Sequence, residues 1–297
     1  DEVLASFAAA DFRKADDGDR ILRDEINLFY HCLQALNYEE MMGYPESETI
    51  CEDTFFESTG LLVSRDDTYI LAAKAGNNAD SHNHNDVGSF TVYKNGKPLI
   101  IDLGVGTYTR ETFSDRRYEI WTMQSQFHNV PTFIKNDTAV KIHRLGMDAA
   151  GDYHDSDILM QKDGEAYAAR DVKCSMDGNS TLFMDIAGAY EGDEVCSYLR
   201  TITHRKGEGI EVLDEYEGSA TALLTLMTYE RPETSVAASG ELKVSIGSLG
   251  DVAIAGGEVI EIQTYPITDE RLKTSWKHEV YRVLIKMSAG RMSLKIS

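Results

Sequence analysis

The spacing of apolar residues divides the chain near residue 45. From Asp19 to Met42, apolar positions recur at alternating intervals of four and three residues, a pattern that predicts one amphipathic helix. Asp19 is a suitable N-cap, and Gly43 followed by Pro45 is a typical stop signal. A shorter helix is predicted over residues 4–12. The apolar stripe of the longer helix consists of Leu22, Ile26, Phe29, Leu33 and Leu36.

Beyond residue 45 the pattern changes to apolar segments typical of β-strands, separated by turn dipeptides such as Asn95-Gly96. Segments with a helical period are scarce, which favours antiparallel pairing. We therefore predict a mainly β protein, with a large antiparallel two-sheet β-sandwich over residues 46–297 and one or two helices within residues 1–45. The predicted strands cover residues 68–75, 88–94, 98–102, 166–173, 181–190, 197–205, 209–218, 222–230, 259–265 and 279–296, the last broken at Ala289-Gly290.

Composition and net charge exclude some kinds of binding partner. The 297 residues include 42% hydrophobic side chains, enough for a sizeable core, and 29 Lys and Arg against 50 Asp and Glu, a net charge of −21. Such an acidic chain is unsuited to binding nucleic acid or an anionic membrane nonspecifically, and no apolar run approaches the roughly 20 residues of a membrane span. No signal peptide is recognised, but we expect the native N-terminus to be absent, so cytoplasmic, periplasmic and secreted locations all stay open.

Four cysteines in a chain of this length do not indicate a disulfide framework. None belongs to a C-x-x-C pair, which argues against a thiolate zinc site. We expect all four to be reduced: Cys32, Cys51, Cys174 and Cys196.

Residues 80–134 contain most of the candidate chemistry. His82 and His84 are separated by one residue, so in a strand both side chains would project from the same face. Asp102 ends an apolar strand and His128 follows an amphipathic stretch, so His84, Asp102 and His128 can converge as two imidazoles and a carboxylate. That donor set suits zinc with an open coordination position. The alternative is that the H-x-H pair arises by chance and that its histidines only satisfy hydrogen bonds.

The order of three motifs resembles a known family. HNHNDVGSF is followed by GKPLIIDLGVGTY, then by a tyrosine-bearing stretch and by FHNVPT. This order is similar to that of the C-terminal module of heparinase II/III-like polysaccharide lyases, over residues 50–215 and most strongly over residues 82–132. The chain departs from the family pattern at Leu103, where a proline commonly follows the aspartate.

The resemblance implies a larger architecture than this chain contains. Family members combine an N-terminal α/α toroid with a C-terminal antiparallel β-sandwich, and substrate lies in the cleft between them. Residues 1–45 would then be a helical linker or a remnant of the toroid, and the chain a C-terminal fragment of a lyase. A natural stand-alone β module is the alternative.

The chemistry implied by the resemblance is β-elimination in a uronic-acid-containing polysaccharide or oligosaccharide. A base removes the proton at C5, the C4–O bond breaks, and an acid protonates the leaving oxygen. His82 matches the catalytic histidine of the family's β domain. His84, Asp102 and His128 match ligands of one divalent metal, expected to be zinc, with calcium as the alternative. The family's catalytic tyrosine and carboxylate neutraliser belong to the toroid, so we expect this fragment to be catalytically incomplete.

Other polar residues are weaker candidates. Asn129 could orient His128 through its amide, and a tyrosine hydroxyl could supply a proton, although β-domain tyrosines are usually packed. Arginines could bind carboxylates, or simply form a solvated face. The candidates for substrate binding or support of the site are Asn129, Tyr108, Arg110, Arg116, Arg117 and Tyr118. A second basic group on one strand comprises Arg200, His204, Arg205 and Lys206.

The charge of the chain also bears on substrate. A heavily sulfated polyanion would be repelled at long range, which favours a less charged uronate polymer as the partner, together with the toroid domain. A glycoside hydrolase would need a pair of carboxylates about 5–10 Å apart, and no such pair stands out. The remaining alternative is a noncatalytic carbohydrate-binding or assembly β-sandwich with a structural metal.

Overall fold

The computed structural model describes residues 2–14, 27–45, 52–136, 139–237, 240 and 242–297. The chain divides into two compact units, Asp1–Cys51 and Glu52–Ser297, which are taken separately below. None of the described helices is both long enough and apolar enough to cross a membrane.

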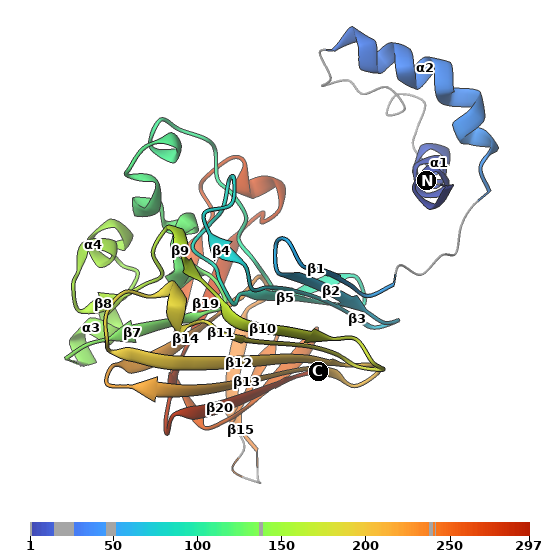
Figure 1. Ribbon diagram of the computed structural model, residues 1–297. Helices are drawn as coiled ribbons and strands as arrows, with labels where there is room; N and C mark the ends of the chain where they lie inside the picture. Colours follow the sequence, from blue (N-terminus) through green and yellow to red (C-terminus); the bar gives the residue numbers. More distant parts are fainter. Residues whose placement is uncertain (1, 15–26, 46–51, 137–138, 238–239, 241) are drawn as a thin grey trace. The chain divides into compact units, whose positions relative to one another are not determined.

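The first unit contains two helices, α1 (Glu2–Lys14) and α2 (Leu28–Gly43) (Figure 1). The predicted long helix is present over its second half, where the Asn27 side chain caps it by accepting a hydrogen bond from the Phe29 amide at 3.0 Å. The predicted cap Asp19 and the stripe residues Leu22 and Ile26 lie outside the described residues. No described residue of α2 is buried, and Leu36 is 79% exposed.

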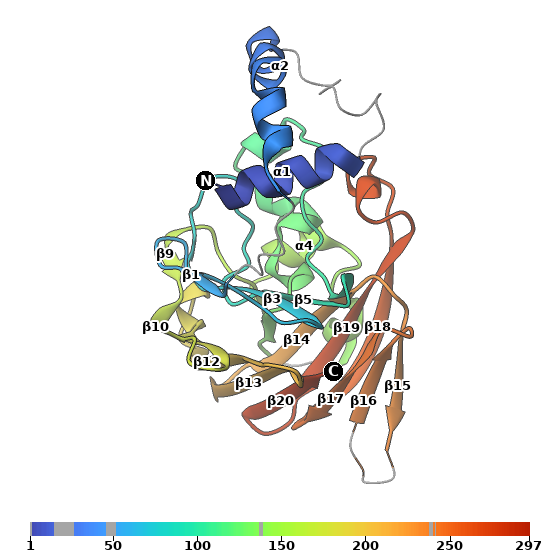
Figure 2. The same ribbon diagram turned by 90° about the vertical axis from the view of Figure 1, so that its right-hand side faces the viewer.

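The second unit is built from antiparallel strands, as predicted, in four sheets (Figures 1 and 2). One five-stranded sheet has the order β1-β2-β3-β5-β6: Thr54–Phe56, Leu61–Arg65, Tyr69–Lys74, Phe90–Lys94 and Lys97–Ile100. The eight-stranded sheet has the order β10-β11-β12-β13-β20-β17-β16-β15: Arg170–Ser175, Ser180–Asp185, Val195–Arg205, Gly209–Gly218, Arg291–Ile296, Gly250–Ala255, Leu242–Ile246 and Pro232–Val236.

The other two sheets complete the unit. The second five-stranded sheet has the order β18-β19-β14-β7-β8: Gly257–Pro266, Glu279–Met287, Thr221–Thr228, Pro131–Ile134 and Ile158–Leu159. The two-stranded sheet pairs β4 (Asn77–Asn78) with β9 (Gly164–Ala168). Short helices lie between strands: η1 (Glu111–Phe113), η2 (Arg117–Glu119), η3 (Trp121–Met123), η4 (Ser125–Phe127), α3 (Ala139–Arg144), α4 (Ala149–His154), η5 (Ala187–Ala189) and η6 (Leu272–Thr274).

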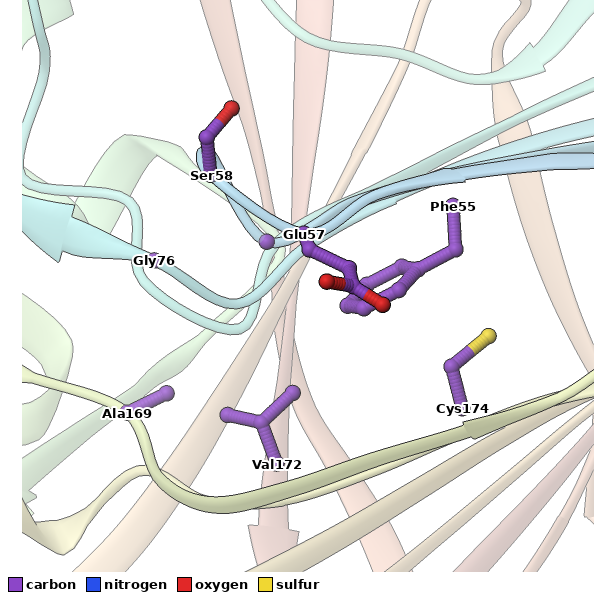
Figure 3. A pocket seen from close by; sticks show the side chains of 8 residues that line it. Phe55, Glu57, Ser58, Gly76, Ala169, Val172 and Cys174 are labelled. Carbon is purple, nitrogen blue, oxygen red and sulfur yellow. The ribbon is translucent and has the colours of Figure 1, made fainter.

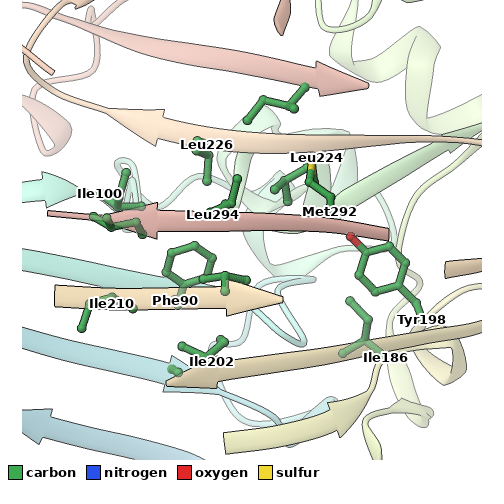
Figure 4. Close-up of a cluster of buried hydrophobic side chains, with 14 of the residues drawn as sticks. Phe90, Ile100, Ile186, Tyr198, Ile202, Ile210, Leu224, Leu226, Met292 and Leu294 are labelled. Atoms are coloured by element: carbon green, nitrogen blue, oxygen red, sulfur yellow. The ribbon is translucent and has the colours of Figure 1, made fainter. Parts of the chain in front are cut away.

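The core lies between the sheets and explains why these segments form strands. β11 alternates buried and half-buried residues along its whole length, and β12 does so over most of its length, as expected for strands with one face on a core. Side chains from the eight-stranded sheet meet those from both five-stranded sheets in one cluster (Figure 4). Its members include Phe90, Ile202, Ile210, Leu224 and Leu294.

Two of the strands predicted as continuous are interrupted in the structure. The segment 181–190 leaves the sheet after Asp185, whose carboxylate accepts hydrogen bonds from the amides of Ala187 and Tyr198. The segment 166–173 is shared between β9 and β10. The predicted strands did not include eight of the observed ones, each of which is at most six residues long: β1, β2, β4, β7, β8, β15, β16 and β17.

From the sequence, the basic group on β12 is a candidate for substrate contact. This assignment is wrong for His204 and Arg200, because both side chains are fully buried. His204 is fully buried, with Nδ1 2.8 Å from Ser64 Oγ and Nε2 3.0 Å from Asp66 Oδ2. Lys206 donates to Asp53 at 2.5 Å. Burial acts to raise the pKa of Asp66, but hydrogen bonds from backbone amides, with Gly207 first, lower it to about 2. These contacts join β2 of one sheet to β12 of the other.

Arg200, the other buried member, is one of the two largest fully buried side chains among the described residues, together with Arg282. Its Nε and one terminal nitrogen donate to the two oxygens of Asp214, both at 2.8 Å. The other terminal nitrogen donates to the carbonyl oxygens of Gly88, at 2.8 Å, and Asn129, at 2.7 Å. The guanidinium of Arg200 therefore binds Asp214, Gly88 and Asn129, and it is not accessible to substrate.

Replacing Asp214 tests this network. Asp214→Asn leaves the guanidinium buried without a neutralising charge, so we expect the free energy of unfolding to fall by about 3–5 kcal/mol. Asp251→Asn removes the carboxylate of an exposed pair with Lys243, 3.1 Å apart, and should cost less than about 1 kcal/mol. Urea denaturation followed by tryptophan fluorescence measures both. Equal losses in the two variants would contradict the assigned role of Asp214.

Candidate metal and catalytic site

Three segments without regular structure bring His84, Asp102 and His128 together. His84 lies in the turn-rich segment after β4, Asp102 follows β6, and His128 follows η4. Each residue offers one potential ligand atom, a ring nitrogen or a carboxylate oxygen. These three atoms all lie within 4.8 Å of one another. The rings of His84 and His128 are 5.2 Å apart, and His128 Nδ1 is 2.7 Å from Asp102 Oδ2. The convergence predicted from the motif is thus present in the structure.

Burial and mutual charge set the protonation of the three groups. Burial, followed by the charge of His128, lowers the pKa of His84 to about 4, so its imidazole is neutral at physiological pH. Burial also acts to lower the pKa of His128, but the neighbouring Asp102 carboxylate raises it above the usual value. For Asp102, burial acts in the raising direction, yet His128 holds the pKa below its usual range. One ionised carboxylate therefore stands beside a neutral imidazole that is free to act as a ligand.

These residues fit a divalent metal ion. His128 is fully buried, and its Nε2 has no hydrogen-bond partner among the described residues. An unpaired buried nitrogen is costly unless something else satisfies it. The set of two imidazole nitrogens and one carboxylate oxygen is a common set of metal ligands.

Asn129 supports the site in a different manner from the one predicted. Its amide does not orient His128. Instead, Nδ2 donates to the carbonyls of Phe90, at 2.7 Å, and Ile101, at 2.8 Å, and Oδ1 accepts from the Met227 amide at 2.7 Å. Asn129 is fully buried and thus has no access to substrate. It fixes the backbone that carries Asp102.

His82 lies outside the buried cluster. The prediction that His82 and His84 share the face of a strand is wrong, because residues 81–89 contain turns and irregular backbone but no strand, and His82 has a φ of +61°. His84 is buried, whereas His82 is exposed. The hydroxyl of Tyr108 is 3.3 Å from His82 Nδ1, and the two rings stack at 6.0 Å. The left-handed turn therefore presents one histidine to solvent and the other to the interior.

The predicted substrate-binding residues Arg117 and Tyr118 contact this turn. Arg117 donates to the carbonyl oxygens of Asn83 and Thr112, both at 2.8 Å, and is half-buried. Tyr118 is buried and donates to Asn83 Oδ1 at 3.2 Å. Both side chains are thus engaged in holding the residue between the two histidines.

The remaining predicted arginines lie on the surface. Arg116 pairs with Glu119, with an N–O distance of 2.7 Å, so its guanidinium already has an anionic partner. Arg110 is exposed at the start of η1. Neither residue approaches the buried cluster through a contact in the structure.

Several residues near the site gave no sequence signal. Gln161 donates to the Val87 carbonyl at 2.7 Å and accepts from the Val87 amide at 2.9 Å, and its own carbonyl accepts from Asn85. Trp276 donates to the Leu103 carbonyl at 2.9 Å. Arg271 lies over the ring of Tyr108, with Cζ 4.7 Å from the ring centroid. More than 70 residues separate each of them from its partner, so no motif spacing relates them.

A separate cavity of about 450 Å³ lies between β1 and β10 (Figure 3). It is lined in part by Phe55, Val172 and Cys174, and none of the predicted site residues belongs to it. Burial raises the pKa of the Cys174 thiol, which disfavours the reactive thiolate. This cavity therefore does not extend the histidine site.

Comparisons with known proteins identify the family and the fold. The C-terminal domain of the heparinase II/III-like family matches residues 52–284. No curated protein sequence matches the chain. A solved heparinase III is 16% identical, with a TM-score of 0.56 over 90% of this chain and 41% of its own. Heparan sulfate lyase HepC from Pedobacter heparinus is 12% identical, with a TM-score of 0.55 over 100% of this chain and 42% of its own.

At these identities the solved structures show the fold alone. The chain spans about two fifths of the length of each. Because the chain shares the fold of these structures, the predicted mainly β architecture is confirmed.

Replacing each of two neighbouring arginines tests whether Arg117 holds the turn that carries His82 and His84. Arg117→Ala removes two charge-assisted hydrogen bonds, each worth about 1.5–3 kcal/mol, so local opening of the turn should become at least about tenfold more frequent. Hydrogen exchange at the amides of Asn83 and Asn85 measures this opening. Arg116→Ala is the matched control and should leave both rates unchanged. Identical exchange in the two variants would show that Arg117 does not hold the turn.

Proposed function

Because this chain belongs to the heparinase II/III-like family through its C-terminal domain, we propose that it is the C-terminal part of a polysaccharide lyase. The reaction is β-elimination in a uronic-acid-containing polysaccharide or oligosaccharide. The observation that carries the proposal is the exposed His82 imidazole, held on a turn whose next histidine is anchored in the buried cluster.

His82 acts as the base in this proposal. A neutral imidazole suits this role because one of its ring nitrogens can accept a proton. When Nδ1 carries the proton and donates to the Tyr108 hydroxyl, Nε2 keeps a lone pair that can accept the C5 proton. The electron pair of the C5–H bond then forms the C4–C5 double bond, the C4–O bond breaks, and the leaving oxygen takes a proton from an acid.

The metal has a supporting role in the proposal. His84, Asp102 and His128 would hold one divalent ion, and the two imidazoles favour zinc over calcium, which prefers oxygen ligands. When bound, the ion supplies a fixed charge that joins three irregular segments. His82 lies two residues from His84, so loss of the ion would displace it.

We propose that the remaining catalytic groups come from an α/α toroid domain. Residues 1–45 would be its remnant or the linker to residues 46–297, which agrees with the exposed apolar side chains of α2. The toroid would supply the tyrosine and a carboxylate neutraliser, so we expect residues 1–297 alone to be inactive. The net charge of −21 favours a uronate substrate without heavy sulfation.

Elemental analysis tests the metal. Protein purified without chelator should contain about one zinc ion per chain, and His84→Ala and His128→Ala should lose it because each removes one of three ligands. His154→Ala is the matched control, since His154 also contacts a carboxylate, 3.2 Å away on Glu119, but is exposed. Equal metal content in all four proteins would contradict the site. Calcium in place of zinc would change only the identity of the ion.

Activity assays test the catalytic role of His82. The complete gene product, incubated with uronate polysaccharides, should generate unsaturated uronate ends that absorb in the ultraviolet. His82→Asn keeps a residue that tolerates the left-handed backbone, so it should retain metal and thermal stability while turnover falls by about 10²–10⁴-fold. His84→Ala should lose metal, stability and turnover together.

Three outcomes would contradict this proposal. Wild-type turnover by His82→Asn would remove His82 as the base. Equal loss of stability in both variants would indicate a purely structural histidine pair. Carbohydrate binding by the complete gene product without any unsaturated product would instead favour a noncatalytic binding module.

A further inference from the structure

Arg271 lies beside the catalytic candidate although 189 positions separate it from His82 in the sequence. Its guanidinium carbon is 4.7 Å from the ring centroid of Tyr108. The hydroxyl of the same tyrosine is 3.3 Å from His82 Nδ1. All three side chains are exposed, so they form one accessible surface, the His82–Tyr108–Arg271 surface.

The loop that carries Arg271 is fastened to the loop that carries Tyr108. The carboxylate of Asp269 accepts from the Thr107 amide at 3.0 and 3.1 Å, and also from the amides of Arg271 and Leu272. Trp276 donates to the Leu103 carbonyl at 2.9 Å. The backbone of Arg271 is thus anchored on both sides, and its guanidinium is placed by the fold.

The guanidinium of Arg271 forms no ion pair with any residue that the structure describes, although the protein is strongly acidic. The two nearest acids in sequence are already engaged. Asp269 binds backbone amides, and Glu270 pairs with Lys273 at 2.6 Å. By contrast, Arg116, Arg200 and Arg205 each pair with a carboxylate.

A fixed, exposed and unpaired guanidinium is suited to binding an anion. Its planar fork can donate two parallel hydrogen bonds to one carboxylate, and the aromatic ring beneath it limits the orientations it can adopt. We propose that Arg271 binds a uronate carboxylate at the His82–Tyr108–Arg271 surface and so determines specificity for acidic over neutral sugars. This inference rests on the proposed lyase function and identifies a carboxylate-binding residue on the β unit.

Such pairing also has a chemical consequence. Removing the C5 proton places negative charge on the carboxylate group, and a guanidinium that already binds that group stabilises the added charge. The three arginines predicted from the sequence are less suited to this task, since Arg116 and Arg117 are engaged and Arg110 makes no contact with Tyr108 or His82 in the structure.

Comparing an acidic oligosaccharide with its neutral analogue distinguishes recognition of the carboxylate from binding of the rest of the sugar. The complete gene product is assayed with an unsulfated glucuronate-containing oligosaccharide as substrate and with its carboxyl-reduced analogue as a competitive inhibitor. Arg271→Ala should lower kcat/KM for the acidic substrate on the order of 10- to 100-fold, the loss expected for a charge-assisted hydrogen bond. The inhibition constant of the neutral analogue should not change. Arg271→Lys keeps the charge without the fork and should fall in between.

A matched control and a stability measurement complete the test. Arg291→Ala removes an exposed arginine that pairs with Glu215, and should leave both constants unchanged. Arg271→Ala should retain its thermal stability because Asp269 and Trp276 keep their contacts. Equal weakening of both ligands would show that Arg271 only packs on Tyr108, and no change for either ligand would likewise overturn the proposal.

Failure of the proposed function is distinguishable from failure of this inference. If the wild-type gene product forms no unsaturated ends, calorimetric titration with the same two oligosaccharides replaces the kinetic assay. A preference for the acidic ligand that Arg271→Ala abolishes would support the inference without lyase activity. Absence of any preference in the wild-type protein would overturn it.

Discussion

The guanidinium of Arg200 joins the scaffold of this protein to its candidate site. It extends from β12, is neutralised by Asp214 on the adjacent β13, and donates to the carbonyls of Gly88 and Asn129. Gly88 ends the turn region that carries both histidines, and Asn129 directly follows His128. A buried arginine that binds backbone carbonyls in this way fixes two chain segments against a rigid strand.

The geometry around Gly88 shows how close this packing is. Gly88 has a φ of +89°, and a Cβ atom there would lie 2.9 Å from Ile186. A side chain at this position would therefore push the histidine turn away from the core. The Gly88 carbonyl, which accepts a hydrogen bond from Arg200, would move with the turn. The absence of a side chain at Gly88 and the buried charge of Arg200 therefore both keep the turn against the core.

The site itself consists of irregular backbone, and this determines which side chains surround it. Amide and carbonyl groups outside strands need other partners when they are buried. Asn129, Gln161 and Trp276 supply several of these partners, while Arg117 does so for the turn between the histidines. The result is a buried cluster of His84, Asp102 and His128 that is held firmly, and an exposed surface at His82 and Tyr108.

The sequence determined the strand-rich class, most of the long strands and the residues of the buried cluster. Alternation identifies strands such as β12 and β13 because one face of each lies on the core, and the order of three motifs identifies His84, Asp102 and His128. Tertiary structure decided the rest. The left-handed turn at His82, the partners of Asn129 and the position of Arg271 depend on contacts between distant segments. Irregular backbone has no period, so neither spacing nor pattern in the sequence records which distant side chain completes its hydrogen bonds.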